Sequence, residues 1–217
     1  MTELLNNLDA QLLMAVNSMH TPVLDTFMRI YTGKWIWAPL YLSLLWYLRC
    51  RMGWRKALLV LLAIIATIAI ADQTCSTLLR PIFQRPRPSH SDNPLLAGLH
   101  IVNGYRGGSY GFPSCHAANS MALAMWFVLL GRMRSPVCYM LVFWAILNCY
   151  TRMYLGVHYP GDLLFGTTVG ISAATLCYCA LRFATDIPRI SGRRASQIPL
   201  ATFGFTFLAI AVYAAIV

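Results

Sequence analysis

The sequence predicts an all-α integral membrane protein, a single domain (1–217) built as a bundle of six transmembrane helices with an N-terminal amphipathic interfacial helix. Of its 217 residues, 58% are hydrophobic and only 11% are charged, whereas soluble domains average roughly 45–50% apolar and about 25% charged residues. Because a spanning helix needs about 20 apolar residues, each long uncharged run is a candidate span. These runs are 35–48, 57–79 (interrupted only by Asp72), 117–131, 135–151, 163–181 and 195–217.

Two of the runs, 35–48 and 117–131, are shorter than the others. A span has about 17 residues at the short end, so these two helices cross the membrane only if they include flanking residues. Trp and Tyr residues mark both ends of the first run, as an aromatic belt at the two membrane surfaces does.

Residues 1–29 are the expected interfacial helix. Apolar residues recur there at spacings of three and four: Leu5, Leu8, Leu12, Val16 and Met19. Such a pattern is typical of a helix that lies in the membrane interface, and packing of the same face on the protein's own bundle explains it equally well. The segment does not resemble a secretory signal, because Glu3 and Asp9 replace the basic region that a signal begins with.

The net charge of +10 indicates membrane topology, and no nucleic-acid partner is expected. Ten of the 17 Lys and Arg residues lie in three alternate loops, within 49–56, 132–134 and 182–194. Cytoplasmic loops carry such an excess of basic residues, so these three loops are predicted to be cytoplasmic. Most of the other basic residues lie on the opposite side, against this bias, and an anionic ligand would explain them.

The first candidate cluster is Arg80–Pro88. Three prolines predict that the preceding helix ends at Leu79 and that the next residues are extended. The segment would present guanidinium groups on a stiff arm, and guanidiniums match phosphate oxygens in pairs. A basic arm that touches lipid headgroups is the equally weighted alternative.

The second cluster is Pro113–His116, directly before a run of helix-forming residues. Ser114 is a good N-cap residue, and a helix N-terminus offers N–H groups to an anion. His116 in the first turn could donate a proton to a leaving oxygen. A structural histidine at the membrane surface is the alternative for His116.

The third cluster is Arg152–Asp162. His158 and Asp162 lie four residues apart with Pro160 and Gly161 between them. An aspartate bonded to one ring nitrogen fixes the tautomer of a histidine and leaves the other nitrogen free as a nucleophile. Arg152 supplies another group that can bind phosphate.

Taken together, the three clusters form one ordered pattern: Arg80-x6-Arg87-Pro88, then Pro113-Ser114-Cys115-His116, then Arg152-x5-His158-x3-Asp162. This pattern resembles the tripartite signature of the type 2 phosphatidic acid phosphatase (PAP2) superfamily, the integral-membrane lipid phosphatases related to vanadium haloperoxidases. Three positions depart from it. Arg80 stands where the family usually has Lys, Cys115 stands for Gly, and Thr151 stands for Ser.

The resemblance implies a set of roles. His158 would attack phosphorus and form a phosphohistidine, Asp162 would orient it, and His116 would protonate the leaving group and then activate water. A second set would bind the phosphate: Arg80, Arg87, Ser114, Cys115 through its backbone N–H, and Arg152. The resemblance implies no metal and no cofactor, and the seven cysteines show no paired ligand spacing.

The implied reaction is metal-independent hydrolysis of a phosphomonoester or pyrophosphate on a membrane lipid. Candidate substrates are undecaprenyl pyrophosphate, a lipid A phosphate, and phosphatidylglycerophosphate or phosphatidic acid. The segment 80–116 would be an active-site loop on the extracytoplasmic (periplasmic) side of a bacterial inner membrane, and His90, Tyr105 and Arg106 in it are candidates for headgroup selection. The sequence does not indicate an oligomeric state.

The alternative function is a membrane protein that binds phospholipid without hydrolysis, or a transporter. Transport predicts ionisable residues near the middle of spans, because such residues line ion and substrate pathways. Only Asp72 has such a position. It lies about 12 Å below Arg80 by helical rise, close enough to support the site.

Overall fold

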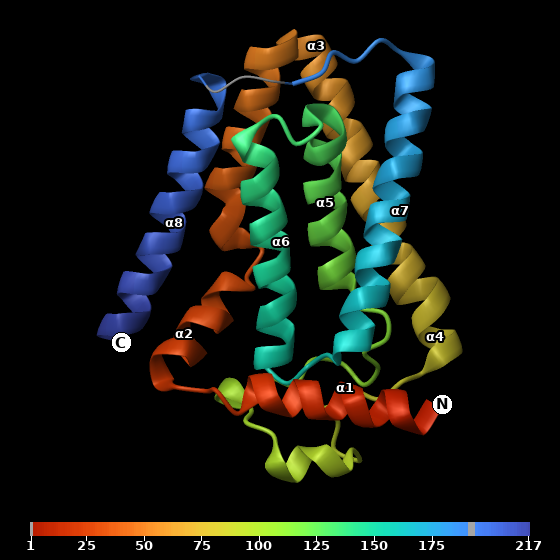
Figure 1. The fold of residues 1–217 in the computed structure, drawn as a ribbon, viewed down its shortest axis with the longest axis vertical. Coiled ribbons are helices and arrows are strands. Elements are labelled where there is room, and N and C mark those ends of the chain that lie inside the picture. The colour runs from red at the N-terminus through yellow and green to blue at the C-terminus, as the bar shows by residue number, and fades with distance from the viewer. Residues whose placement is uncertain (1, 191–193) are drawn as a thin grey trace.

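The computed structural model describes residues 2–190 and 194–217, and these are helical or in loops. Within them no β-strand forms, and only Pro86 and Tyr110 make an isolated antiparallel bridge. Five helices run along the long axis of the molecule (Figure 1): α3 (Ala38–Gln73), α5 (Cys115–Gly131), α6 (Pro136–Tyr154), α7 (Pro160–Ala184) and α8 (Gln197–Ile216). The prediction of an all-α protein is confirmed for the described part of the chain.

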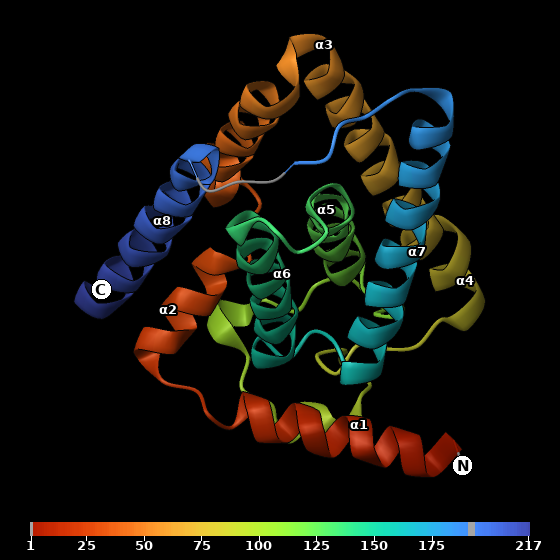
Figure 2. The ribbon, with the colours of Figure 1, turned by 45° about the horizontal axis from the view of Figure 1, so that its top comes forward.

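Helix α1 (Thr2–Asn17) lies across one end of the bundle, as Figures 1 and 2 show. We call this end the α1 end. The opposite end, the far end, holds the turn at Gly53, the connection 132–135 and residues 185–190.

Among the residues that the structure describes, three helices are long and apolar enough to cross a membrane: Trp35–Phe83, Pro160–Ala184 and Gln197–Ile216. The first of them is not straight. Gly53 has φ 75° and ψ 167°, a conformation that glycine adopts readily because it lacks a Cβ. The chain turns there, and its limbs 38–52 and 54–73 diverge from the turn as the two arms of an inverted V in Figure 2. These limbs correspond to the predicted runs 35–48 and 57–79.

The expectation of one helix over 1–29 is wrong. The chain forms two helices instead, α1 and α2 (Pro22–Tyr31). Thr21 has an extended backbone and its side chain accepts a hydrogen bond from the N–H of Leu24. Because a threonine N-cap followed by proline starts a helix afresh, residues 18–21 separate the two helices.

The expectation that the helix ends at Leu79 is also wrong. A π-helical segment (Thr74–Leu79) and the short helix α4 (Arg80–Phe83) continue it. Pro81 is accommodated because it lies in the first turn of α4, where a backbone N–H is not needed. The helix ends instead at Gln84, which is left-handed with φ 43°.

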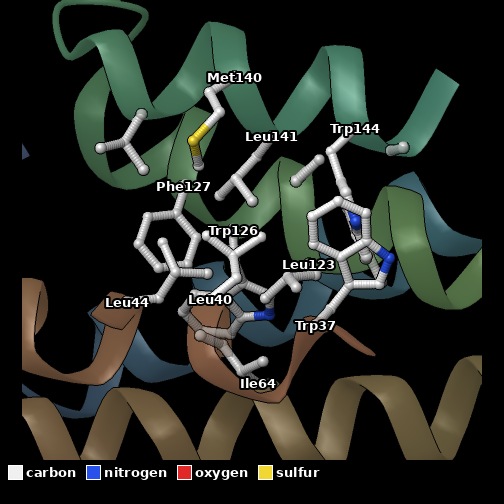
Figure 3. Close-up of a cluster of buried hydrophobic side chains, with 14 of the residues drawn as sticks. Trp37, Leu40, Leu44, Ile64, Leu123, Trp126, Phe127, Met140, Leu141 and Trp144 are labelled. Atoms are coloured by element: carbon white, nitrogen blue, oxygen red, sulfur yellow. The ribbon is translucent and has the colours of Figure 1, made fainter. Parts of the chain in front are cut away.

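Helix α5 is the centre of the bundle, between α3, α6 and α7 (Figure 2). Figure 3 shows apolar side chains of α3, α5 and α6 packed around it, among them Trp37, Leu44, Trp126 and Trp144. Two indole N–H groups in this core are hydrogen-bonded: Trp126 Nε1 donates to Thr67 Oγ1 at 2.9 Å, and Trp37 Nε1 donates to the Tyr31 carbonyl oxygen at 2.8 Å.

Helices α5 and α7 approach unusually closely along a seam of two glycines. A Cβ on Gly166 would collide with the carbonyl oxygen of Ser114, and one on Gly170 with that of Ala118. Glycines four residues apart let membrane helices pack backbone to backbone. The seam thereby holds the first turn of α5 beside the first turns of α7.

Candidate active site

The structure brings the three sequence clusters together at the α1 end. They lie in α4 and the segment after it, in the first turn of α5, and in the last turn of α6 with the connection 155–159 and the first turn of α7. The backbone N–H of Ser114 donates to the carbonyl oxygen of Asp162 at 3.0 Å, so the second and third clusters are joined directly.

His158 is held in one tautomer by its two neighbours. Its side chain is 2% exposed, Nε2 lies 2.8 Å from Arg87 Nη1, and Nδ1 lies 3.3 Å from Asp162 Oδ2. A guanidinium can only donate hydrogen bonds, so Nε2 must accept and therefore carries the lone pair. The ring proton is on Nδ1, toward the carboxylate, as a nucleophilic Nε2 requires.

Asp162 is completely buried in the first turn of α7. Its Oδ2 also accepts from the backbone N–H of Tyr159 at 3.0 Å, which caps the helix. Its Oδ1 accepts from Arg85 Nη1 at 2.9 Å. Gly111 covers the pair, and a Cβ there would lie 3.0 Å from Asp162 Oδ2.

Three arginines surround His158 without a carboxylate of their own. Arg87 and Arg152 are buried and Arg80 is half-buried. Their bonded partners include no carboxylate: the Pro113 carbonyl and Cys115 Sγ for Arg80, the Val157 carbonyl and His158 for Arg87, and the hydroxyls of Thr32 and Tyr105 for Arg152. In the part of the chain that the structure describes, none of the three makes an ion pair, and the Nε atom of each is buried without a partner.

Uncompensated buried charge is unfavourable, and it lowers the pKa values of Arg87 and His158. Burial, reinforced by Arg152 and Arg80, lowers the pKa of Arg87 to about 10. Burial together with Arg87, Arg152 and Arg80 lowers the pKa of His158 well below its ordinary value. An anion bound among these groups would relieve their repulsion, so the site is suited to phosphate.

Ser114 is the N-cap of α5, as predicted, with its hydroxyl accepting from Ala117 N at 3.5 Å. The backbone N–H groups of Cys115 and His116, in the first turn, have no partner within the helix. Cys115, which replaces the expected glycine, accepts a hydrogen bond on Sγ from Arg80 Nη2 at 3.0 Å. The thiol therefore holds Arg80 beside the first turn of α5.

His116 faces a cavity of about 540 Å³ between the two limbs of α3, α5 and α6. Its ring makes no hydrogen bond within the described residues, and it lies in the electrostatic field of the three arginines and His158. Away from His116 the walls are mostly apolar, with Leu44, Leu61 and Phe127 among them. Asp72 lies in the same wall and accepts from Asn119 Nδ2 at 2.8 Å.

Of the three headgroup candidates, only Tyr105 contacts the site. Its hydroxyl accepts from Arg152 Nη2 at 3.0 Å, and Arg29 lies 4.9 Å above its ring. Burial raises the pKa of Tyr105, but Arg152, Arg87 and Arg29 outweigh it and lower the pKa. Arg106 is exposed, and the His90 ring accepts from the backbone N–H of Asp92. The backbone N–H of His90 donates to the Arg87 carbonyl oxygen at 3.0 Å, but within the described residues no hydrogen bond joins the His90 or Arg106 side chain to the three arginines.

Two residues of the site have no assigned role in the sequence reasoning. Arg85 lies between two arginines that were assigned to phosphate, and only its partners in the structure set it apart. Asp9 Oδ2 lies 2.7 Å from Arg85 Nη2. No sequence signal links Asp9 to residues 76 positions away, since helix periodicity concerns only local neighbours.

Comparison with known proteins places the chain in a family. The PAP2 superfamily profile matches residues 56–186. The chain is 42% identical over 221 residues to a protein named lipid A 4'-phosphatase from Bacteroides thetaiotaomicron, covering 98% of each. It is 30% identical over 184 residues to a lipid A 4'-phosphatase from Porphyromonas gingivalis, covering 84% of this chain and 76% of that protein.

Two solved structures share the fold. The crystal structure of Aquifex aeolicus LpxE matches with a TM-score of 0.57 at 24% identity, over 78% of this chain and 93% of that one. The PAP2-type phosphatidylglycerolphosphate phosphatase of Bacillus subtilis matches with a TM-score of 0.59 at 22% identity, over 84% and 89%. At these identities the likeness concerns the fold alone.

Fold, motifs and relatives together define a membrane phosphatase: the chain belongs to the PAP2 superfamily. It is an enzyme, a lipid phosphatase of the PAP2 type. The reading as a non-hydrolytic binding protein or transporter is thereby set aside.

Proposed function

We propose that the protein removes the 4'-phosphate of lipid A, without a metal ion, through a phosphohistidine intermediate. The observation that carries this proposal is the set of three arginines, free of carboxylates, around the lone pair of His158 Nε2. The names of the two relatives favour lipid A among the phosphorylated lipids. Undecaprenyl pyrophosphate and phosphatidylglycerophosphate or phosphatidic acid offer the same phosphate chemistry and serve as comparison substrates.

In the first step the phosphate oxygens bind Arg80, Arg87 and Arg152. Because Arg87 is now bonded to phosphate, it releases His158 Nε2. Nε2 forms a bond to phosphorus as the bond between phosphorus and the leaving oxygen breaks. His116 gives its proton to that oxygen. Asp162 stabilises the positive charge on the His158 ring through Nδ1–H.

In the second step His116, now neutral, takes a proton from water. The water oxygen bonds to phosphorus, the bond to Nε2 breaks, and inorganic phosphate leaves. In both steps the arginines and the first-turn N–H groups of α5 balance the charge of the pentacoordinate transition state. The guanidiniums thereby do the electrostatic work of a metal ion.

The apolar cavity beside His116 suits the hydrocarbon part of a lipid. It begins at the proposed acid and extends between the limbs of α3. A phosphate among the arginines would place the attached lipid toward this cavity, because His116 lines the cavity and Gly111 covers the Nδ1 side of His158.

The proposed topology has six spans, the two limbs of α3 and the helices α5 to α8, with α1 in the membrane interface. Leu13 of α1 is buried against the protein, whereas Leu4, Leu8 and Leu12 are exposed and would contact lipid. The far end carries the three basic loops and would be cytoplasmic. The α1 end would then face the periplasm of a bacterial inner membrane.

Single cysteines test the sidedness. In a background without the native cysteines, an impermeant thiol reagent added to spheroplasts should label Ser91→Cys at the α1 end and spare Asp186→Cys at the far end. Both positions are exposed. Labelling of position 186 alone would reverse the orientation, and labelling of both would contradict the six-span topology.

Mass spectrometry tests the reaction. Purified protein in detergent, with excess EDTA, should convert bisphosphorylated lipid A to a product that lacks only the 4'-phosphate, and His158→Ala protein should not. A denaturing quench at alkaline pH, where the P–N bond of phosphohistidine is stable, should trap phosphate on His158 during turnover of the wild type. Loss of the 1-phosphate, or activity that requires added Mg²⁺, would contradict the proposal.

A further inference from the structure

Asp162, the carboxylate that orients His158, is itself held from outside the motifs. Its Oδ2 serves His158 and the N–H of Tyr159, while its Oδ1 accepts from Arg85 Nη1 at 2.9 Å. With Oδ1 fixed, the carboxylate cannot rotate away from the His158 ring. The position of Arg85 therefore determines how Asp162 faces the nucleophile.

Arg85 is in turn held by α1. Its Nη2 donates to Asp9 Oδ2 at 2.7 Å, and its guanidinium stacks on the Tyr159 ring at 4.2 Å. Asp9 Oδ1 accepts from the backbone N–H of Gly161 at 2.9 Å. A Cβ on Gly161 would lie 2.8 Å from Asp9 Oδ2, so glycine is needed for this close approach.

The residues of α1 that face the bundle lie four positions apart. Asp9, Leu13 and Asn17 all contact the bundle: Leu13 packs with Leu99 and Tyr159, and Asn17 Nδ2 donates to the Tyr154 carbonyl at 2.7 Å. Only Asp9 among them contacts the charged groups of the site. Leu13 and Asn17 dock the helix, whereas Asp9 connects it to the chemistry.

We infer that Asp9 and Arg85 are positioning residues for the reaction, which makes α1 part of the active site. Asp9 holds Arg85, and Arg85 holds Asp162 so that Oδ2 stays on His158 Nδ1. This inference rests on the proposed function of His158 as nucleophile. Neither residue touches phosphate in this arrangement, so both act on the rate of the chemical step rather than on binding.

A double-mutant cycle tests the connection. Asp9→Asn and Arg85→Gln should each lower kcat by roughly 10- to 100-fold, the size of effect expected from a misplaced catalytic group, with KM changed little. If Asp9 acts through Arg85, adding Asp9→Asn to Arg85→Gln should lower kcat no further. Additive losses would mean that Asp9 only fastens α1, and no loss in either variant would overturn the inference.

The pH profile gives a second readout with opposite signs. The charged and titratable groups that face His158 are Arg80, Arg87, His116, Arg152 and Asp162. Removing the negative charge of Asp9 should move the acid limb of kcat/KM to lower pH. Removing the positive charge of Arg85 should move it higher, each by about half a unit or more.

The matched control is Leu13→Ala, which loosens α1 without changing charge. It should lower thermal stability and leave the acid limb in place. Arg85→Lys, which keeps the charge but loses the fork, should recover part of kcat and restore the acid limb. Equal profiles for Asp9→Asn and Leu13→Ala would reduce the role of Asp9 to docking.

Two safeguards separate this inference from the proposed function. Wild-type protein that is inactive on every lipid would contradict the proposed function alone. The pKa shifts of His158 can still be measured without turnover, by NMR titration of ¹³C-labelled histidine with the His158 signal assigned from His158→Ala. Active wild type with unshifted variants would overturn only the role of Asp9 and Arg85. Asp9→Glu replaces Asp9→Asn in the cycle if the latter does not accumulate.

Discussion

The two ends of the bundle both gather basic side chains, but only one buries them. At the far end Arg55, Arg132 and Arg134 are exposed, and Lys56 pairs with Asp186 at the surface. At the α1 end Arg87 and Arg152 are 7% and 2% exposed. The far-end charges suit topology, whereas the buried ones repel each other until an anion arrives. Solvent exposure distinguishes the arginines that suit membrane topology from those that suit anion binding. This exposure cannot be read from the sequence.

The largest expected effect belongs to the α1 end. His158→Ala and His116→Ala should each reduce phosphate release by several orders of magnitude, because nucleophile and acid act as a unit. Release is measured from lipid A in detergent, with size-exclusion behaviour as the check on folding. Near-wild-type turnover of His158→Ala would exclude the covalent mechanism.

The next effect compares arginines between the ends. Arg87→Ala and Arg152→Ala should each lower kcat/KM by about 10²- to 10³-fold, since each removes a donor to the transition state. Arg55→Ala and Arg132→Ala should leave kcat/KM unchanged. A comparable loss from a far-end variant would break the distinction between the two sets.

The acid limb of kcat/KM gives a smaller effect. Protonation of His158 removes the attacking lone pair, and burial with Arg87, Arg152 and Arg80 lowers its pKa. The wild-type limb should therefore lie below pH 6.5, the ordinary histidine range. Arg152→Gln removes a facing positive charge, raises the pKa of His158 and should move the limb upward, whereas Arg55→Gln should not. A limb above pH 7 in the wild type would contradict the tautomer and charge assignment.

The smallest effect concerns Cys115. Cys115→Gly restores the residue expected in the family and removes one hydrogen bond to Arg80. A hydrogen bond of this kind contributes about 0.5–1.5 kcal/mol, so kcat/KM should change less than about tenfold. A loss as large as that of Arg87→Ala would give the thiol a role in the chemistry.

Sequence reasoning predicted the parts of the fold that depend on local composition. Apolar runs gave the helices, and the spacing of prolines, glycines and motif residues gave the order of the clusters. Proximity of His158 and Asp162 followed from their separation of four residues. The N-cap at Ser114 followed from the residues after it.

The parts that were not predicted depend on long-range packing or on details of the backbone. The break between α1 and α2 depends on how Thr21 caps Leu24, and the extension to Phe83 depends on where Pro81 falls in a turn. The roles of Asp9 and Arg85 depend on α1 crossing the α1 end of the bundle. Among Arg80, Arg85 and Arg87 the sequence offers no distinction, because all three are arginines in one short segment.

The glycine seam between α5 and α7 also determines a distance within the site. His116 belongs to one of these helices and Asp162 to the other, so the distance between the two residues depends on how closely the two backbones approach. Gly166 and Gly170 bring those backbones into contact, so the two helices cannot slide along each other. The packing of two helices, rather than the conformation of a loop, therefore sets the distance between His116 and Asp162.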